Sequence, residues 1–141
     1  MTPLVIDASV AAKWVLPKEK LAVEAAELLA GYGKGEIAFA VPDLFWAETA
    51  NILWKAARLG RQTRAQTEVG LQELLSLALP TTPSVDLVSV ALRLAIAYDR
   101  TIYDSLYLAL AVKLSTRLIT ADEKLARSVA AHLPVEWLGA R

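Results

Sequence analysis

The 141-residue sequence contains no cysteine and only one histidine, His132. Without cysteine, the chain cannot form a disulfide, attack a substrate through a thiolate or bind zinc through sulfur. With one histidine, a single chain cannot supply the paired imidazoles of a two-histidine acid–base mechanism, nor a histidine-rich metal site. A metal centre built by this chain would therefore depend mainly on oxygen ligands.

The sequence also lacks an excess of charge and any long apolar run. Fifteen basic residues balance fifteen acidic ones, so net charge gives no sign of nucleic-acid binding. Such binding would need a local patch, or metal ions that meet the phosphates. No uncharged stretch approaches a membrane span, and the apolar run at residues 4–6 is too short for a signal peptide. We expect a cytoplasmic protein that makes no contact with a membrane.

Apolar segments of strand length alternate with segments of helical periodicity, and 55% of the residues are hydrophobic. This pattern predicts one α/β domain, residues 1–141, with a mostly parallel sheet and a sizeable core. Strands are expected at residues 4–6, 37–41, 117–120 and 135–138, with an extended segment at 80–84. Helices are expected at residues 9–16, 19–30, 43–59, 63–79, 85–97, 103–114 and 121–131, with Gly31 ending the second and a Thr63–Gln66 capping box starting the fourth.

Two acidic residues lie just beyond the ends of predicted strands. Asp7 comes after strand 4–6 and Asp122 after strand 117–120. Ligands of open parallel sheets bind beyond the carboxyl ends of the strands, where both side chains would lie. Each also has a purely structural interpretation: Asp7 as a helix N-cap, and Asp122 as part of a capping box that begins at Thr120. Position alone leaves both interpretations open.

Asp104 is the only acid of a segment that is otherwise apolar. Residues 105–112 carry no charge and are apolar almost all round, which predicts a buried helix. Asp104 lies in its first turn, where it could belong to a capping arrangement with Thr101. Burying a carboxylate costs several kcal/mol unless it is paired or bound to a metal ion. A cap and a metal ligand are both consistent with this placement.

Glu48 lies inside the predicted helix 43–59, on a narrow polar stripe with Asn51, Lys55 and Arg58. In one interpretation the stripe faces water, and the periodicity by itself favours this. In the other it lines a groove, where Glu48 binds metal and the two cations meet phosphates. The remaining circumference is mostly apolar, with Trp46 and Trp54, so we expect this helix to contribute to dimerisation and partner binding.

Together, the four carboxylates indicate a particular chemistry. An all-oxygen ligand set suits a hard cation such as Mg²⁺ or Mn²⁺. Such ions polarise phosphoryl oxygens and generate hydroxide from bound water, which suits phosphodiester hydrolysis. A carboxylate cluster also repels phosphate unless a metal ion is present, so metal binding explains how a neutral protein could act on RNA.

Four segments resemble the signature segments of PIN-domain ribonucleases, and most closely those of VapC toxins from type II toxin–antitoxin systems. In chain order they are residues 5–10 (VIDASV), 44–51 (LFWAETAN), 103–111 (YDSLYLALA) and 118–125 (LITADEKL). The resemblance covers essentially the whole chain, with the segments in the right order and at ordinary spacing.

The resemblance implies a Rossmann-like PIN fold and a Mg²⁺- or Mn²⁺-dependent endoribonuclease. It also implies that Asp7, Glu48, Asp104 and Asp122 are the family's catalytic and metal-binding acids, accompanied by the Thr120 hydroxyl. The implied partners are an RNA substrate, a second copy of the chain in a homodimer, and a VapB-like antitoxin whose C-terminal segment blocks the site.

Three alternative functions remain. A PIN-domain nuclease could act in RNA processing without an antitoxin. A phosphoacceptor receiver domain is also α/β with an acidic Mg²⁺ pocket, but that pocket typically needs paired acids after the first strand, and here Asp7 stands alone. An inactive RNA-binding module would be indicated by loss of one acid of the quartet, and all four are present.

Overall fold

The computed structural model describes all 141 residues and contains a five-stranded, wholly parallel sheet in the order β3-β2-β1-β4-β5. Leu4 pairs with Phe39 on one side of the central strand, and Ile6 pairs with Ile119 on the other. The predicted α/β architecture is thus confirmed. The strands are β1 (Leu4–Ile6), β2 (Phe39–Pro42), β3 (Thr81–Thr82), β4 (Leu118–Thr120) and β5 (Val135–Trp137).

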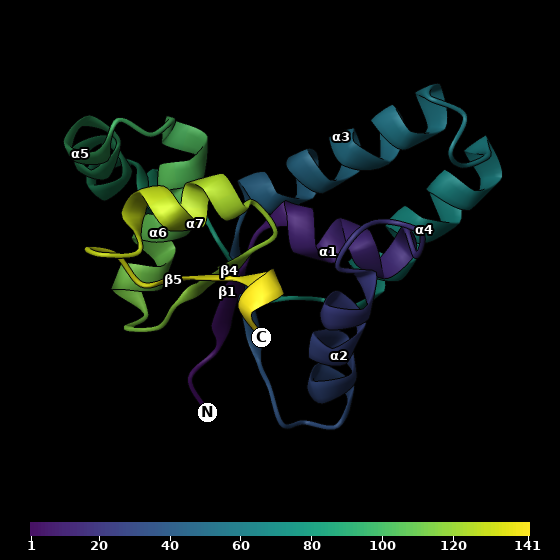
Figure 1. The fold of residues 1–141 in the computed structure, drawn as a ribbon, viewed down its shortest axis with the longest axis horizontal. Helices are drawn as coiled ribbons and strands as arrows, with labels where there is room; N and C mark the ends of the chain where they lie inside the picture. The colour runs from purple at the N-terminus through teal and green to yellow at the C-terminus, as the bar shows by residue number, and fades with distance from the viewer.

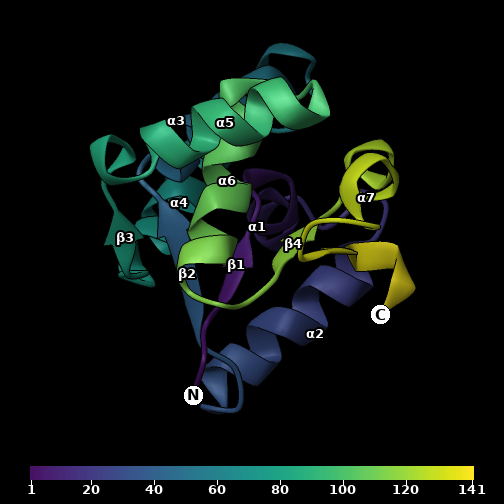
Figure 2. The same cartoon turned by 90° about the vertical axis from the view of Figure 1, so that its left-hand side faces the viewer.

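Helices cover both faces of this sheet (Figure 1). Helix α6 lies against one face, and α1 with α2 lie against the other (Figure 2). None of the helices combines the length and apolarity that a membrane span requires. The helices are α1 (Ala8–Val15), α2 (Ala22–Gly33), α3 (Leu44–Arg58), α4 (Arg64–Ser76), α5 (Val88–Tyr98), α6 (Ile102–Lys113) and α7 (Glu123–Val129), with 3-10 turns η1 (Ser84–Asp86) and η2 (Leu138–Ala140).

The core is one cluster of 30 buried residues that extends across the sheet. Helix α6 is its centre: residues 105–111 are all buried, as the apolar sequence predicts. Because α6 packs against β1, β2 and β4, the loops beyond these strands emerge at defined places. The core therefore positions the edge of the sheet where the acidic residues lie.

Helix α2 differs from its prediction. It begins at Ala22 and continues to Gly33, so Gly31 lies inside the helix rather than ending it. A Cβ atom at Gly31 would come within 2.7 Å of the Ile37 Cδ1 atom. A larger residue at position 31 would therefore require the Ile37 side chain to shift, because the segment that leads to β2 packs on the helix there. Sequence spacing alone could not distinguish this close contact from a C-cap.

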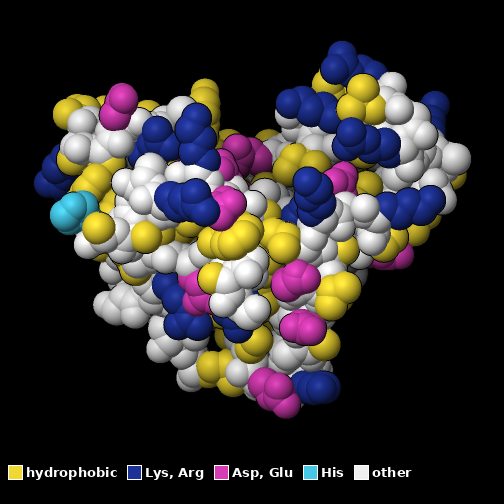
Figure 3. All heavy atoms as spheres, in the orientation of Figure 1, with side chains coloured by type: hydrophobic (Ala, Val, Ile, Leu, Met, Phe, Trp, Pro, Cys, Tyr) yellow, Lys and Arg dark blue, Asp and Glu magenta, His cyan; other side chains and the backbone are white.

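The helices form two lobes on either side of the sheet edge. Helices α5, α6 and α7 lie on one side, and the hairpin of α3 and α4 extends away on the other (Figure 1). The surface is hollowed into a notch between the two lobes, and acidic side chains are visible at its floor (Figure 3).

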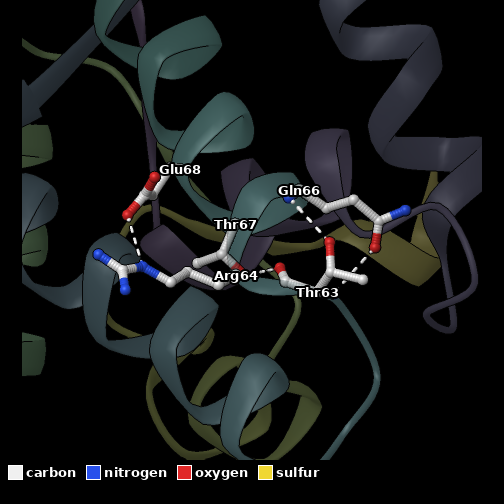
Figure 4. A network of polar contacts seen from close by, with 5 residues as sticks. All are labelled: Thr63, Arg64, Gln66, Thr67 and Glu68. Atoms are coloured by element: carbon white, nitrogen blue, oxygen red, sulfur yellow. Dashed lines mark hydrogen bonds and ion pairs between the residues drawn. The ribbon is translucent and has the colours of Figure 1, made fainter.

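The start of α4 confirms the predicted capping box. The Thr63 side chain accepts a hydrogen bond from the backbone of Gln66, and the Gln66 side chain accepts one from the backbone of Thr63 (Figure 4). Arg64 pairs with Glu68 one turn later at 3.1 Å. These local contacts define where α4 begins after the turn from α3, and so help to set the shape of the hairpin.

Candidate active site at the sheet edge

Asp7 and Thr120 meet because β1 and β4 are neighbours. Ile6 pairs with Ile119, so the residues that follow emerge side by side at the carboxyl edge. The Thr120 hydroxyl donates a hydrogen bond to Asp7 Oδ2 at 2.8 Å. The backbone N–H of Ser9 donates to Asp7 Oδ1 at 3.4 Å, which makes Asp7 the N-cap of α1. The side chain therefore caps a helix and also lies at the strand edge.

Asp122 follows β4 and caps α7 itself. Its Oδ1 accepts a hydrogen bond from the Leu125 backbone at 3.0 Å, and its own backbone N–H donates to Thr120 Oγ1 at 3.0 Å. The interpretation of a capping box that begins at Thr120 is therefore wrong. Thr120 ends the strand, and its hydroxyl links Asp122 to Asp7 instead.

Glu48 projects from the second turn of α3, the helix that follows β2. Its Oε1 accepts a hydrogen bond from the Tyr107 hydroxyl of α6 at 2.7 Å. Farther along the same helix, Asn51, Lys55 and Arg58 are exposed. The polar stripe thus faces solvent at its far end, while Glu48 is only partly exposed and is held by a side chain of the core.

Asp104 lies in the first turn of α6. The Thr101 hydroxyl oxygen accepts a hydrogen bond from the Asp104 backbone at 3.0 Å, so Thr101 is the cap of the helix. The capping arrangement with Thr101 is thus confirmed, and a metal-binding role for Asp104 stays a prediction. The capping function belongs to Thr101, and the Asp104 carboxylate is not required for it.

The charges of Asp7, Glu48 and Asp104 act on one another, and the charge of Asp122 acts on Asp104. Burial raises the pKa of Asp7 to about 6, and the charges of Glu48 and Asp104 add to this effect. Burial also raises the pKa of Glu48, with a further contribution from Asp104. The pKa of Asp104 is raised by burial and by Asp122, against the opposing charge of Arg100. Repelling carboxylates held together in this way are suited to receive a cation.

The donor set fits a hard divalent cation, because it consists of carboxylate and hydroxyl oxygens only. In the described arrangement, no three Asp, Glu or His side chains are close enough to hold one ion. Binding would therefore require a side chain to move. Asp122 is exposed, and its carboxylate accepts one hydrogen bond, from Leu125, so it is the acid with most freedom to turn.

Three residues near the acids were not predicted from the sequence. Tyr107 contacts Glu48, Arg100 lies near Asp104, and Ser9 Oγ accepts a hydrogen bond from the backbone of Ala121 at 3.2 Å. Tyr107 does carry a signal, since its hydroxyl is a polar group in a segment that is otherwise apolar. Arg100 and Ser9 carry none, because their significance depends on which loops the sheet brings together.

The fold and this edge define a class: α/β proteins with an acidic site at the carboxyl ends of parallel strands. The family model for the PIN domain matches residues 4–130, most of the chain. The chain belongs to the PIN-domain family.

Comparisons with individual proteins agree with this assignment. Ribonuclease VapC3 from Pyrobaculum aerophilum is 34% identical over 125 residues, covering 87% of this chain and 92% of the relative. The crystal structure of PAE2754, also from Pyrobaculum aerophilum, has a TM-score of 0.72 at 25% identity, covering 99% of this chain and 85% of the other. A toxin–antitoxin complex from Klebsiella pneumoniae has a TM-score of 0.59 at 16% identity, covering 94% and 95%.

Proposed function

We propose that this protein is a metal-dependent endoribonuclease and the toxin of a VapBC-type toxin–antitoxin pair, acting in the cytoplasm. The observation that carries the proposal lies at one edge of a PIN-domain sheet: the Thr120 hydroxyl donates to Asp7, the charges of Glu48 and Asp104 act on Asp7, and the charge of Asp122 acts on Asp104. Similarity to a ribonuclease named VapC3 over nearly the whole chain supports the activity. We infer that residues 1–141 form a single domain.

Within this function, Asp7, Glu48, Asp104 and Asp122 would hold Mg²⁺ or Mn²⁺. The bound ion would polarise the phosphoryl oxygen and lower the pKa of bound water. Thr120 donates to one oxygen of Asp7 and thereby orients the carboxylate. The burial that raises the pKa of Asp7 also limits access of bulk water to this end of the site.

The surface supports the approach of a polyanion. Acidic side chains lie at the floor of the notch, while Lys and Arg side chains lie on both lobes above it (Figure 3). On the α3 side, Lys55 and Arg58 are exposed on the helix that carries Glu48. At 1.5 Å per residue, Arg58 lies about 15 Å along the helix from Glu48, a distance that a few nucleotides could span. We therefore expect RNA to lie along α3, with its phosphates against these cations.

Removal of divalent cations tests the proposed function directly. We expect chelation by EDTA to reduce cleavage of single-stranded RNA at least about 100-fold, because the ion supplies several kcal/mol of charge stabilisation. Either Mg²⁺ or Mn²⁺ should restore activity. Cleavage products would be resolved by gel electrophoresis and their ends sequenced. Undiminished phosphodiester cleavage in excess chelator would refute metal dependence.

Replacement of Lys55 and Arg58 by alanine tests the RNA path. We expect weaker RNA binding and a salt dependence that falls by about 0.7 per lost phosphate contact, because fewer counterions are released. Fluorescence anisotropy with a labelled oligonucleotide at several salt concentrations would measure both quantities. Lys34→Ala is the control, since Lys34 is exposed at the end of α2, outside the notch. An unchanged salt slope in the double variant would argue against this path.

The antitoxin has a suitable docking surface in the apolar groove between α3 and α4. The groove has a volume of about 320 Å³, and Trp54 on its wall is 52% exposed. Trp46, the other expected anchor, packs on Phe45 and donates a hydrogen bond to Thr81 within the chain. Trp54 is therefore the better candidate. The groove is lined by Ala50, Leu53, Trp54, Ala57, Arg64, Thr67, Glu68 and Leu71.

A homodimer is supported by a second apolar surface, on α5. Leu92 and Ile96 are 51% and 76% exposed, and they follow Val88, 43% exposed, at helical spacing. A row of aliphatic side chains on one helix face is typical of surfaces that are covered in an assembly. We propose that a second copy of the chain covers it, leaving the notch open to RNA.

A further inference from the structure

We propose that Tyr107 is a positioning residue that orients the Glu48 carboxylate for metal binding. This inference rests on the proposed function, in which Glu48 is a metal ligand. Tyr107 is not one of the acids, and its hydroxyl would not itself bind the ion. Its effect would act through the single hydrogen bond that it donates to Glu48.

The contact has the geometry of a strong, directed hydrogen bond. The Tyr107 hydroxyl donates to Glu48 Oε1 at 2.7 Å, within the range of charge-assisted hydrogen bonds to a carboxylate. Oε2, the other oxygen of the same carboxylate, accepts no hydrogen bond from the protein. Tyrosine thus holds one oxygen and leaves its neighbour free to bind a cation.

The donor is much more rigid than the acceptor. Tyr107 is 2% exposed and lies in the fully buried stretch of α6, where packing limits the movement of its ring. Glu48 has three rotatable side-chain bonds and stands at the edge of the notch, partly open to solvent. A flexible carboxylate must lose rotamer freedom before it can bind a metal ion, and a fixed donor removes part of that entropic cost beforehand.

The position of Tyr107 on α6 supports the same role. Helix α6 packs under β1 and β2, the strands that lead to Asp7 and to α3. Tyr107 lies one turn after Asp104 on this helix, so one element carries both an acid of the cluster and the group that holds another. Helix α6 therefore fixes the Asp104 carboxylate and the hydroxyl that holds Glu48 relative to each other.

A purely structural role is the competing interpretation, because a buried tyrosine hydroxyl normally needs some hydrogen-bond partner. Tyr32 provides the matched comparison. Its hydroxyl donates to the backbone carbonyl of Leu77 at 3.1 Å, and it lies on α2, away from the acids. Tyr107→Phe and Tyr32→Phe each remove one oxygen atom and one tyrosine hydrogen bond, but only the first hydrogen bond ends on a proposed metal ligand.

The test is Mn²⁺ binding by isothermal titration calorimetry, with no RNA present. We expect Tyr107→Phe to weaken Mn²⁺ binding about 10-fold, as removal of groups that orient metal ligands commonly does. Tyr32→Phe should bind Mn²⁺ as the wild type does. In a Glu48→Gln background, Tyr107→Phe should cause little further loss, because the carboxylate on which Tyr107 acts is already absent.

Each other result would overturn the proposal in a recognisable way. Wild-type affinity in Tyr107→Phe would show that the hydrogen bond does not prepare the site. Equal losses in Tyr107→Phe and Tyr32→Phe would indicate general destabilisation, and a full additional loss in the Glu48→Gln background would show that Tyr107 does not act through Glu48. Failure of the wild-type protein to bind Mn²⁺ would overturn the proposed metal dependence and this inference together.

A second measurement applies if Tyr107→Phe does not fold. The wild-type protein, labelled with ¹³C at the tyrosine Cζ atoms, would be titrated with Mg²⁺ and followed by NMR. The chain has four tyrosines, so Phe variants at Tyr32, Tyr98 and Tyr103 would assign the Tyr107 signal by elimination. We expect Mg²⁺ to shift the Tyr107 signal and not that of Tyr32. An unchanged Tyr107 signal at saturating Mg²⁺ would overturn the proposal.

Discussion

Asp7→Asn is expected to abolish RNA cleavage and, at the same time, to make the metal-free protein more stable at neutral and alkaline pH. The carboxylate is proposed as a metal ligand, and its amide analogue is a poor one, so activity should fall at least about 100-fold. In asparagine the amide oxygen can still accept from the Ser9 N–H, and the amide nitrogen can donate to the Thr120 hydroxyl oxygen, so both positions keep a partner. The fold should therefore survive the substitution.

The stability gain follows from the raised pKa of Asp7. Its pKa is 3.8 as a free residue and about 6 in the folded protein, so the folded state holds the proton more tightly than the unfolded state does. Burial is the main cause. The contribution to stability is therefore fully present below about pH 4 and is lost as the pH rises through 6. Above this range the ionised form costs up to about 3 kcal/mol, and asparagine avoids that cost.

Thermal unfolding in EDTA at several pH values would measure this effect. We expect the Tm of Asp7→Asn to exceed that of the wild type at pH 8 by about 5 °C or more, and the difference to vanish near pH 4. Asp86→Asn, an exposed aspartate in η1, is the control and should change neither Tm nor activity. A lower Tm for Asp7→Asn at pH 8 would mean that its structural role outweighs the cost of its charge.

Asp104→Asn is expected to reduce RNA cleavage at least about 100-fold while leaving the fold intact. The reason is the division of roles in the first turn of α6, where the Thr101 side chain caps the helix through the Asp104 backbone. The substitution leaves that hydrogen bond in place. Circular dichroism and thermal unfolding should resemble those of the wild type, and RNA cleavage would be followed at saturating Mg²⁺.

Thr63→Ala is expected to have the opposite effect, lowering stability while leaving activity in place. It removes the cap of α4, outside the acidic cluster, and should cost about 1 kcal/mol of stability while cleavage by the folded protein persists.

Cleavage by Asp104→Asn at the wild-type rate would show that Asp104 is only a structural residue. Unfolding of that variant would show that its carboxylate supports the helix despite the cap by Thr101.

Local sequence patterns were sufficient for most of the secondary structure. The buried helix α6, the capping box of α4 and the strands around Asp7 and Thr120 follow from periodicity and from short-range hydrogen bonding. Gly31 and Thr120 were misinterpreted for a common reason. Each has a local role that its sequence neighbours suggest, whereas its actual role depends on a contact outside its own helix or strand. Gly31 faces Ile37 beyond the end of α2, and Thr120 contacts Asp7 beyond the end of β1.

The sequence alone determined the kinds of ligand available, because a chain without cysteine and with one histidine can offer a metal ion little but oxygen. It also placed Asp7 and Asp122 at strand ends, since a strand is recognisable from a few apolar residues. Only the tertiary structure showed that Glu48 is held by the hydroxyl of Tyr107. Glu48 and Tyr107 are separated by 59 positions and meet because α3 and α6 lie at the same edge of the sheet. The periodicity of each helix carries no information about this contact between them.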